Sequence, residues 1–219
     1  MAVEDSSQSR KGREDSQRVE IYGDPCGAKP ANISSPLRFS LGSDHLGQAH
    51  THQNIARLYE RQGRNPEGLD HSRQALELYR LAGYRHGEAI TLNAIGWRLA
   101  VLGDHHEALR YCEQALVLLE ELDDRYGQAG TWDSIGYARH HLGRHDEAIA
   151  CYQRAIALFR EVGDRYCEAE TVAYVGDLHD ASGAADAARQ AWQYSLEIFD
   201  ELGHPDAAAV RDKLRTADP

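Results

Sequence analysis

The sequence contains few lysines and no long apolar segment. Lysine occurs only at Lys11, Lys29 and Lys213, and 24 basic residues stand against 35 acidic ones, which gives a formal charge of −11. Proteins that bind nucleic acids usually neutralise phosphates with many Lys and Arg side chains. We therefore expect no direct contact with DNA or RNA. Because no apolar run approaches the roughly 18 residues that cross a membrane, we also expect no membrane association.

Cysteine is scarce as well, with four residues and no C-x-x-C pair. This usage favours a reducing compartment, and residues 1–13 lack the apolar segment of a secretory signal. The sequence therefore predicts a cytoplasmic protein. We expect Cys112 and Cys151 to be small buried side chains, and Cys167, in the repeated block, to be an exposed free thiol.

Catalytic and metal-binding motifs are missing too. The chain has no P-loop, no G-x-S-x-G elbow, no Rossmann glycine fingerprint and no H-E-x-x-H motif. We therefore predict that it is not an enzyme and needs no cofactor. The densest histidines are His105-His106 and His140-His141 with His145. His105 and His145 stand one 40-residue period apart, about 10 Å if neighbouring layers follow helix spacing, so one metal ion could not bind both.

The sequence does contain an internal repeat with a period of 40 residues, and a period of this length is typical of repeat architectures. The repeated block reads SDHLGQA, GYRHGEA, DDRYGQA, GDRYCEA and GHPDAAA at 43–49, 83–89, 123–129, 163–169 and 203–209. No insertion interrupts the spacing. We predict four repeats, at 43–82, 83–122, 123–162 and 163–202, followed by a capping helix and tail at 203–219.

Each repeat has the pattern of two helices. In the third, apolar and small residues recur at helical spacing from 125 to 142, and a second such series ends at Gly163. Gly143 and Gly163 are expected to end the two helices, and Asp164 to cap the next one. Small residues at one repeat position, among them Gly136, should let paired helices approach closely.

The third repeat resembles the tetratricopeptide family in Trp132-x2-Ile135-Gly136, followed by Ala148-x3-Tyr152. It departs from that family in Arg139, where Tyr is preferred, in the missing terminal Pro, and in its period of 40 rather than 34. The longer unit is similar to tetratricopeptide regions of actinobacterial transcriptional regulators and to repeats of cell-polarity adaptor proteins. The resemblance implies an all-α fold, a right-handed α-solenoid of stacked helix-turn-helix repeats.

Residues 1–42 have a different composition, with many charged residues, Ser, Gly and Pro and few large apolar side chains. Such a segment cannot bury enough surface to offset the entropy of ordering, so we predict that it is disordered. A DNA-binding or ATPase domain would not fit within it.

The resemblance also implies that the first helix of each repeat lines a concave face. Asn and Gln suit an extended backbone because they donate and accept hydrogen bonds, and Trp and Tyr are frequent at binding hot spots. The alternative for the aromatic residues is packing between repeats. The predicted partner-binding residues are Gln53, Arg57, Asn93, Trp97, Asp133, Tyr137 and His140.

The sequence thus predicts a module that binds a protein or peptide partner in this groove, within a transcriptional-regulatory or signalling pathway. The negative charge favours a ligand with some positive charge. The alternative is a sensor in which a small molecule or signalling peptide enters the same groove.

Overall fold

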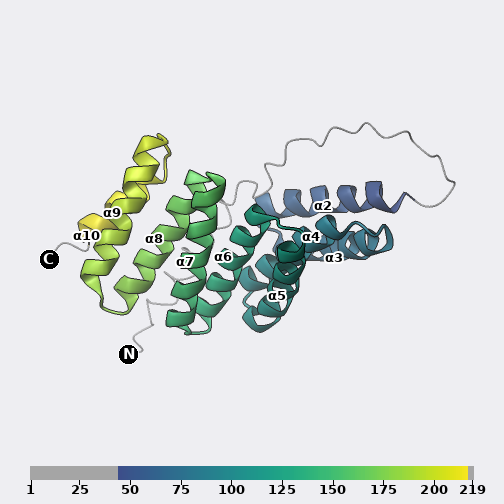
Figure 1. Ribbon diagram of the computed structural model, residues 1–219, viewed down its shortest axis with the longest axis horizontal. Coiled ribbons are helices and arrows are strands. Elements are labelled where there is room, and N and C mark those ends of the chain that lie inside the picture. The colour runs from purple at the N-terminus through teal and green to yellow at the C-terminus, as the bar shows by residue number, and fades with distance from the viewer. Residues whose placement is uncertain (1–43, 217–219) are drawn as a thin grey trace, which may run out of the picture. The chain divides into compact units, whose positions relative to one another are not determined.

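The computed structural model describes residues 44–216, and this part of the chain forms helices joined by short turns, with no strand (Figure 1). The helices are α2 (His45–Arg61), α3 (Asn65–Leu81), α4 (Arg85–Val101), α5 (His105–Glu121), α6 (Arg125–His141), α7 (His145–Val162), α8 (Arg165–Ala181), α9 (Ala185–Glu201) and α10 (Ala207–Thr216). From α2 to α9, each helix begins 20 residues after the one before it. The predicted all-α repeat fold is therefore confirmed. Residues 1–42, predicted to be disordered, lie outside the described residues.

The helix ends follow the local sequence. Asp44, Asp124 and Asp164 each accept a hydrogen bond of 2.9 Å from the backbone N–H three residues further on. Each bond satisfies one of the amides that a helix start leaves free, so the cap predicted at Asp164 is confirmed. At the helix ends, Gly163 has the left-handed conformation, with φ of 78°. Among the described residues, Asp123 alone takes a positive φ (52°) without being glycine, and Asp tolerates this better than most residues.

The chain divides into two compact units, Met1–Thr91 and Leu92–Pro219, and the division falls within α4. In the first unit α2 packs against α3, with Ala49, Ala75 and Tyr79 at the centre of the contact. In the second unit the helices from α5 to α10 pack in the order in which they follow along the chain (Figure 1). The second unit includes five of the seven predicted partner-binding residues: Asn93, Trp97, Asp133, Tyr137 and His140.

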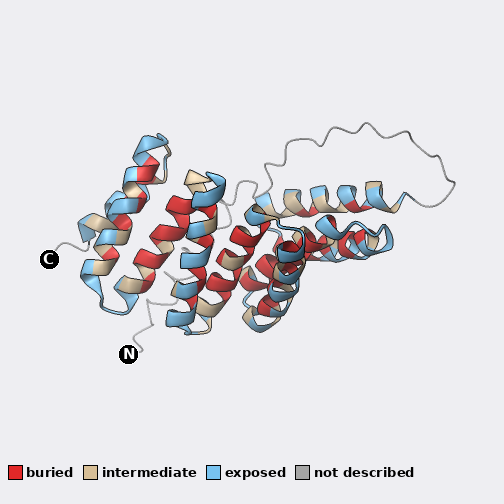
Figure 2. Ribbon diagram, viewed as in Figure 1, coloured by how far each residue is buried: buried red, intermediate tan, exposed pale blue. Residues whose placement is uncertain are grey.

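In two of the helix pairs, a glycine on the first helix faces a large side chain on the second. A Cβ atom added to Gly136 on α6 would lie 2.8 Å from Tyr152 Cδ1 on α7. A Cβ atom added to Gly176 on α8 would lie 2.5 Å from Trp192 Cδ1 on α9. A Cβ atom in a real protein does not lie this close to another side chain, so neither position has room for a larger residue as the helices stand. The predicted close approach of α6 and α7 at Gly136 is therefore confirmed. Figure 2 shows the resulting buried strips along the helices.

The last helix, α10, closes the apolar core of the second unit. Ala207 and Val210 are 4% and 3% exposed and belong to the same core cluster as Trp192 and Phe199 of α9. Leu214 packs against this cluster from one turn further on. The end of α9 is therefore covered by apolar residues of the chain itself.

Candidate functional site

In the fourth repeat, the repeated seven-residue block ties the first helix to the second helix of the same repeat and to the turn that follows it. After the cap at Asp164, Arg165 bonds Glu201 at the end of α9 over 3.0 Å. The Tyr166 ring lies 5.8 Å from that of Phe199, and its hydroxyl donates to Asp206 at 3.2 Å. Each of these contacts joins α8 to a helix or turn that follows it. In this repeat the block is therefore a structural joint.

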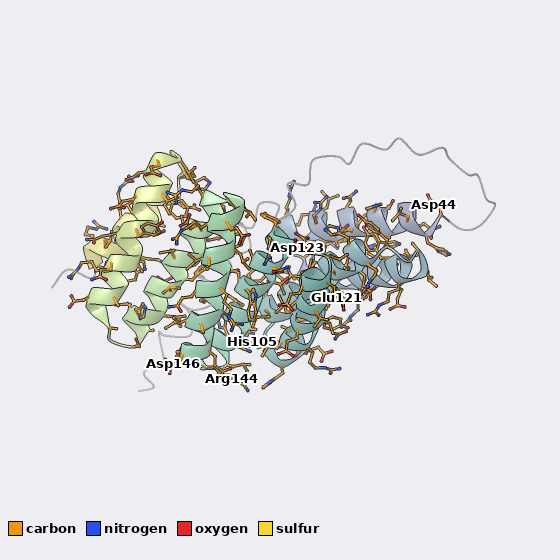
Figure 3. The ribbon with its side chains drawn as sticks, viewed as in Figure 1. Asp44, His105, Glu121, Asp123, Arg144 and Asp146 are labelled. Carbon is orange, nitrogen blue, oxygen red and sulfur yellow. The ribbon has the colours of Figure 1, made fainter. Side chains whose placement is uncertain are left out.

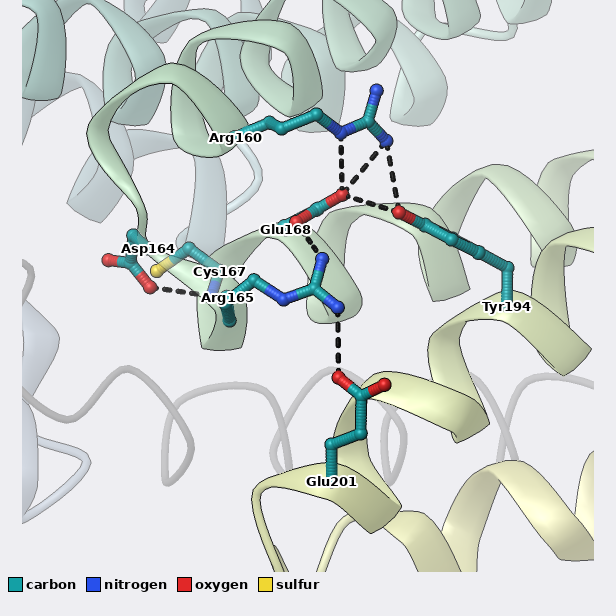
Figure 4. Close-up of polar contacts among 7 residues, drawn as sticks. All are labelled: Arg160, Asp164, Arg165, Cys167, Glu168, Tyr194 and Glu201. Carbon is teal, nitrogen blue, oxygen red and sulfur yellow. Dashed lines mark hydrogen bonds and ion pairs between the residues drawn. The ribbon is translucent and has the colours of Figure 1, made fainter.

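A buried carboxylate organises the joint between α7 and α8 (Figure 4). The side chain of Glu168 is fully buried, and it accepts hydrogen bonds from Arg160 (2.9 Å), Arg165 (2.7 Å) and Tyr194 (2.9 Å). Burial alone would raise the pKa of Glu168, but these three bonds outweigh burial and lower the pKa below its ordinary value. The ionised carboxylate thus holds the end of α7, the start of α8 and the middle of α9 together.

In the first unit, the two predicted partner-binding residues both have neighbours within that unit. Gln53 Oε1 accepts a hydrogen bond of 2.6 Å from the hydroxyl of Tyr79. Arg57 is half-buried and donates to Asn54 Oδ1 on the same helix at 2.7 Å. The binding roles of Gln53 and Arg57 stay predictions.

In the second unit, three of the predicted residues are largely inaccessible. Trp97 and Tyr137 are each 5% exposed, and Asp133 is 0% exposed and accepts a hydrogen bond of 3.2 Å from Thr171 on α8. Asn93 is half-buried, with Oδ1 3.7 Å from Cys112 Sγ. Such burial favours packing roles for Trp97, Tyr137 and Asp133, the alternative that the sequence left open for the aromatic pair.

Three of the predicted residues, Trp97, Tyr137 and His140, nevertheless belong to one continuous set of rings. We define the aromatic–imidazole cluster as Trp97, His105, Tyr137, His140, His141 and His145. The Tyr137 ring centroid lies 5.0 Å from that of Trp97 and 4.3 Å from that of His141. The His141 ring lies 5.0 Å from His140, which lies 5.6 Å from His145. The cluster therefore leads from the buried side of α4 to the exposed end of α6.

Sequence reasoning considered His105 and His141 only as possible metal ligands and did not include them among the partner-binding residues. Their rings stack with centroids 4.9 Å apart and an angle of 10° between planes, although they come from α5 and α6. His141 is exposed and follows Tyr137 by one helical turn, which is the signal that could have identified it. Figure 3 labels His105 together with Arg144 and Asp146, which flank His145 at the start of α7.

The structure also locates the cysteines and tests for metal sites. Cys112 and Cys151 are buried as predicted, and burial raises the pKa of both thiols. All three of these cysteines are free, and Cys167, expected to be exposed, is half-buried instead, so that burial raises its pKa too. Within residues 44–216, no three His, Cys, Asp or Glu side chains are placed to hold a metal ion. Every helix in this same range is too short or too polar to traverse a bilayer.

Comparison with known proteins supports the fold assignment from sequence. The family model described as tetratricopeptide repeat matches residues 48–121 and 127–201, which together make up more than half of the chain. No curated protein matches the chain in sequence.

Several solved structures share the fold at low sequence identity. Aspartyl phosphate phosphatase F from Bacillus subtilis is 18% identical with a TM-score of 0.73, over 80% of this chain and 46% of that one. A Rap protein complexed with competence and sporulation factor is 16% identical with a TM-score of 0.71, over 81% and 50%. A signal transduction ATPase with a tetratricopeptide repeat sensor, from Pyrococcus horikoshii, is 15% identical with a TM-score of 0.69, over 78% and 26%.

The chain thus spans half or less of the length of these three proteins, and the likeness concerns the fold alone. The family match covers both ranges of helix pairs, and the close contacts at Gly136 and Gly176 fit the packing of such repeats. The chain therefore belongs to the tetratricopeptide repeat family.

Proposed function

We propose that the chain is a module that binds a protein or peptide partner, and that the partner contacts the exposed end of the aromatic–imidazole cluster in the second unit. The observation that carries this proposal is the continuity of the cluster. Buried Trp97 and Tyr137 form its base, and His140 and His141 continue it to the surface of α6.

The cluster has the physical properties of a binding surface. The rings of Tyr137, His105 and His141 hold one another in place by packing, so little side-chain entropy is lost when a partner binds them. Flat rings present a large contact area, and imidazole nitrogens can donate or accept hydrogen bonds. A peptide backbone or a polar side chain would find both kinds of contact here.

The similar proteins support binding without naming the partner. One neighbour was solved as a complex with competence and sporulation factor, and another is described as carrying a tetratricopeptide repeat sensor. The analogy supports a role in a signalling or transcriptional-regulatory pathway, and the scarcity of cysteine favours the cytoplasm. Recognition by the repeats needs no catalytic group, so the proposed role is not enzymatic.

The second candidate is a ligand sensor in which a small molecule contacts the same cluster. The description of the Pyrococcus horikoshii repeats as a sensor favours it. A ligand that binds only the folded chain raises the melting temperature as its concentration rises. Stabilisation by a small molecule would support the sensor, whereas stabilisation only by a purified protein or peptide would support the interaction module.

Site-specific photo-crosslinking tests the proposed function. A photoreactive amino acid is placed at His141, on the first helix of its pair, or at Gln153, an exposed position on the second helix. In the first unit, the photoreactive amino acid is placed in the same way at Arg57 on the first helix, α2, or at Gln74 on the second helix, α3. We expect one partner to be captured from His141 and not from Gln153. Equal capture from both positions, or capture from Gln153 alone, would contradict the proposed binding face.

A further inference from the structure

A carboxylate on α8 is paired with an ammonium group from α10. Lys213 Nζ lies 2.7 Å from Asp177 Oδ1 and 2.6 Å from Asp177 Oδ2. Trp192 Nε1 on α9 donates a hydrogen bond to Asp177 Oδ1 at 2.9 Å. Three helices therefore meet at one carboxylate. The side chains of Lys213 and Asp177 remain 37% and 36% exposed, so the ion pair is accessible to solvent.

Both members of this ion pair stand at repeat positions whose equivalents in the third repeat, Asp133 and Tyr137, are buried, yet Asp177 and Lys213 remain partly exposed. Asp177 lies one 40-residue period after Tyr137, and Lys213 lies two periods after Asp133. Among residues 44–216, Lys213 is the single lysine. The chain thus places its only ammonium group in this range against a carboxylate at the position equivalent to Tyr137.

We propose that Asp177 is a subsite for a lysine or arginine side chain of the partner, and that Lys213 occupies it when no partner is bound. The proposal rests on the proposed function and adds the chemistry of the partner. The formal charge of −11 attracts a basic partner, and the exposed Asp180 adds a carboxylate one turn further along α8.

The geometry allows the exchange without unfolding α10. Ala207 and Val210 anchor this helix in the core, so its position does not depend on Lys213. The lysine stem is flexible, and exposed ion pairs contribute little to stability. A partner's cation can therefore take the place of the Lys213 ammonium while α10 stays docked. Lys213 then acts as an internal competitor that weakens the binding of basic partners.

A small guanidinium probe tests the subsite without knowledge of the partner. L-argininamide is titrated into the full chain labelled with nitrogen-15, and the indole N–H signals of Trp97, Trp132 and Trp192 are followed by NMR. Single Trp→Phe variants assign the three signals. Because the Trp192 indole bonds Asp177 directly, its shift reports on that carboxylate.

Removing the competing charge should strengthen probe binding. We expect Lys213→Met, which keeps the aliphatic stem, to lower the Kd of L-argininamide about fivefold, equivalent to about 1 kcal/mol. Lys213→Gln should do the same. Asp177→Asn keeps an acceptor for the indole and should abolish the saturable shift of Trp192. The matched control is Asp186→Asn on α9, whose carboxylate is 96% exposed and whose loss should leave the Kd unchanged.

The opposite results would overturn the proposal. An unchanged Kd in both Lys213 variants, with wild-type circular dichroism, would mean that Lys213 does not compete. A persisting Trp192 shift in Asp177→Asn would mean that the probe binds elsewhere. If these tests fail while crosslinking at His141 succeeds, only the subsite is wrong. If they succeed while crosslinking fails, Asp177 still binds a cation, but the partner does not contact the aromatic–imidazole cluster.

Discussion

Helices α6 and α7 are packed against each other and have 17 and 18 residues, yet they bury different kinds of side chain. In α7 the buried residues are one aliphatic or aromatic stripe with one thiol: Ala148, Cys151, Tyr152, Ala155 and Phe159. In α6 every residue from 127 to 138 is buried or half-buried, including Gln128, Thr131, Asp133 and Ser134. The first helix is therefore an inner element with neighbours on several sides, and the second is a surface element.

The buried polar groups of α6 are tolerated because they are hydrogen-bonded. Thr131 and Ser134 donate to the carbonyls of the residues four positions earlier, at 2.8 and 2.9 Å. Gln128 donates to the Leu119 carbonyl at 3.0 Å, and Asp133 accepts from Thr171. The same difference recurs in the next pair, where α8 buries Glu168, Glu170 and Thr171 and α9 buries only Ser195 among polar residues. Polarity in a first helix thus does not imply exposure.

The largest expected effect comes from truncating a ring on the inner helix. Tyr137→Ala removes a side chain that is 5% exposed and contacts the rings of Trp97, His105 and His141. We expect a loss of about 3–5 kcal/mol in the free energy of unfolding, measured by urea denaturation. Gln153→Ala, on the exposed side of α7, should change it by less than about 0.5 kcal/mol. Similar losses in both variants would remove the distinction between inner and surface helices.

A smaller loss is expected from adding volume at the contact between the two helices. Gly136→Leu on α6 should cost about 1–3 kcal/mol, because even a Cβ atom there would press on the Tyr152 ring. Ala150→Leu on α7 adds a side chain at an exposed position and should leave the urea midpoint nearly unchanged. An unchanged midpoint in Gly136→Leu would contradict the close approach.

These differences separate what the sequence predicts from what it does not. Periodicity located the stripe of α7, and the 40-residue spacing located Gly136 and the cap at Asp164, since these depend on local pattern. The burial of Asp133 could not be predicted, because its partner Thr171 lies 38 residues away on another helix. The stacking of His105 on His141 could not be predicted either, because the two residues lie on different helices. Trp97, a predicted site residue, does belong to the aromatic–imidazole cluster. How far its side chain is buried depends on contacts with other helices, which the periodicity of one helix does not reveal.

The buried carboxylate of α8 predicts a pH dependence. Glu168 has a lowered pKa in the folded chain, so its stabilising bonds are fully present above its ordinary pKa of 4.5 and are lost as the pH falls through the folded value. Near neutral pH, Glu168→Gln should cost about 1–2 kcal/mol, because charge-assisted hydrogen bonds are lost. The difference in the free energy of unfolding between wild type and Glu168→Gln should become smaller below pH 4.5, where the Glu168 carboxylate begins to be protonated.

The control for this effect is Glu161→Gln on α7, whose side chain is 60% exposed. The free energy of unfolding of this variant should depend on pH as that of the wild type does, because an exposed ion pair contributes little to stability. If Glu168→Gln and Glu161→Gln give the same profile in urea denaturation, the carboxylate of Glu168 does not hold the joint.

The most direct test of the account compares partner affinity for variants of the two kinds of helix. The partner identified by crosslinking is purified, and its Kd is measured by calorimetry for wild type, His141→Ala and Gln153→Ala. We predict that His141→Ala weakens binding about fivefold, or about 1 kcal/mol, without loss of helical signal, and that Gln153→Ala binds as wild type does. Normal binding by His141→Ala together with weakened binding by Gln153→Ala would place the partner on the second helices and contradict the proposed function.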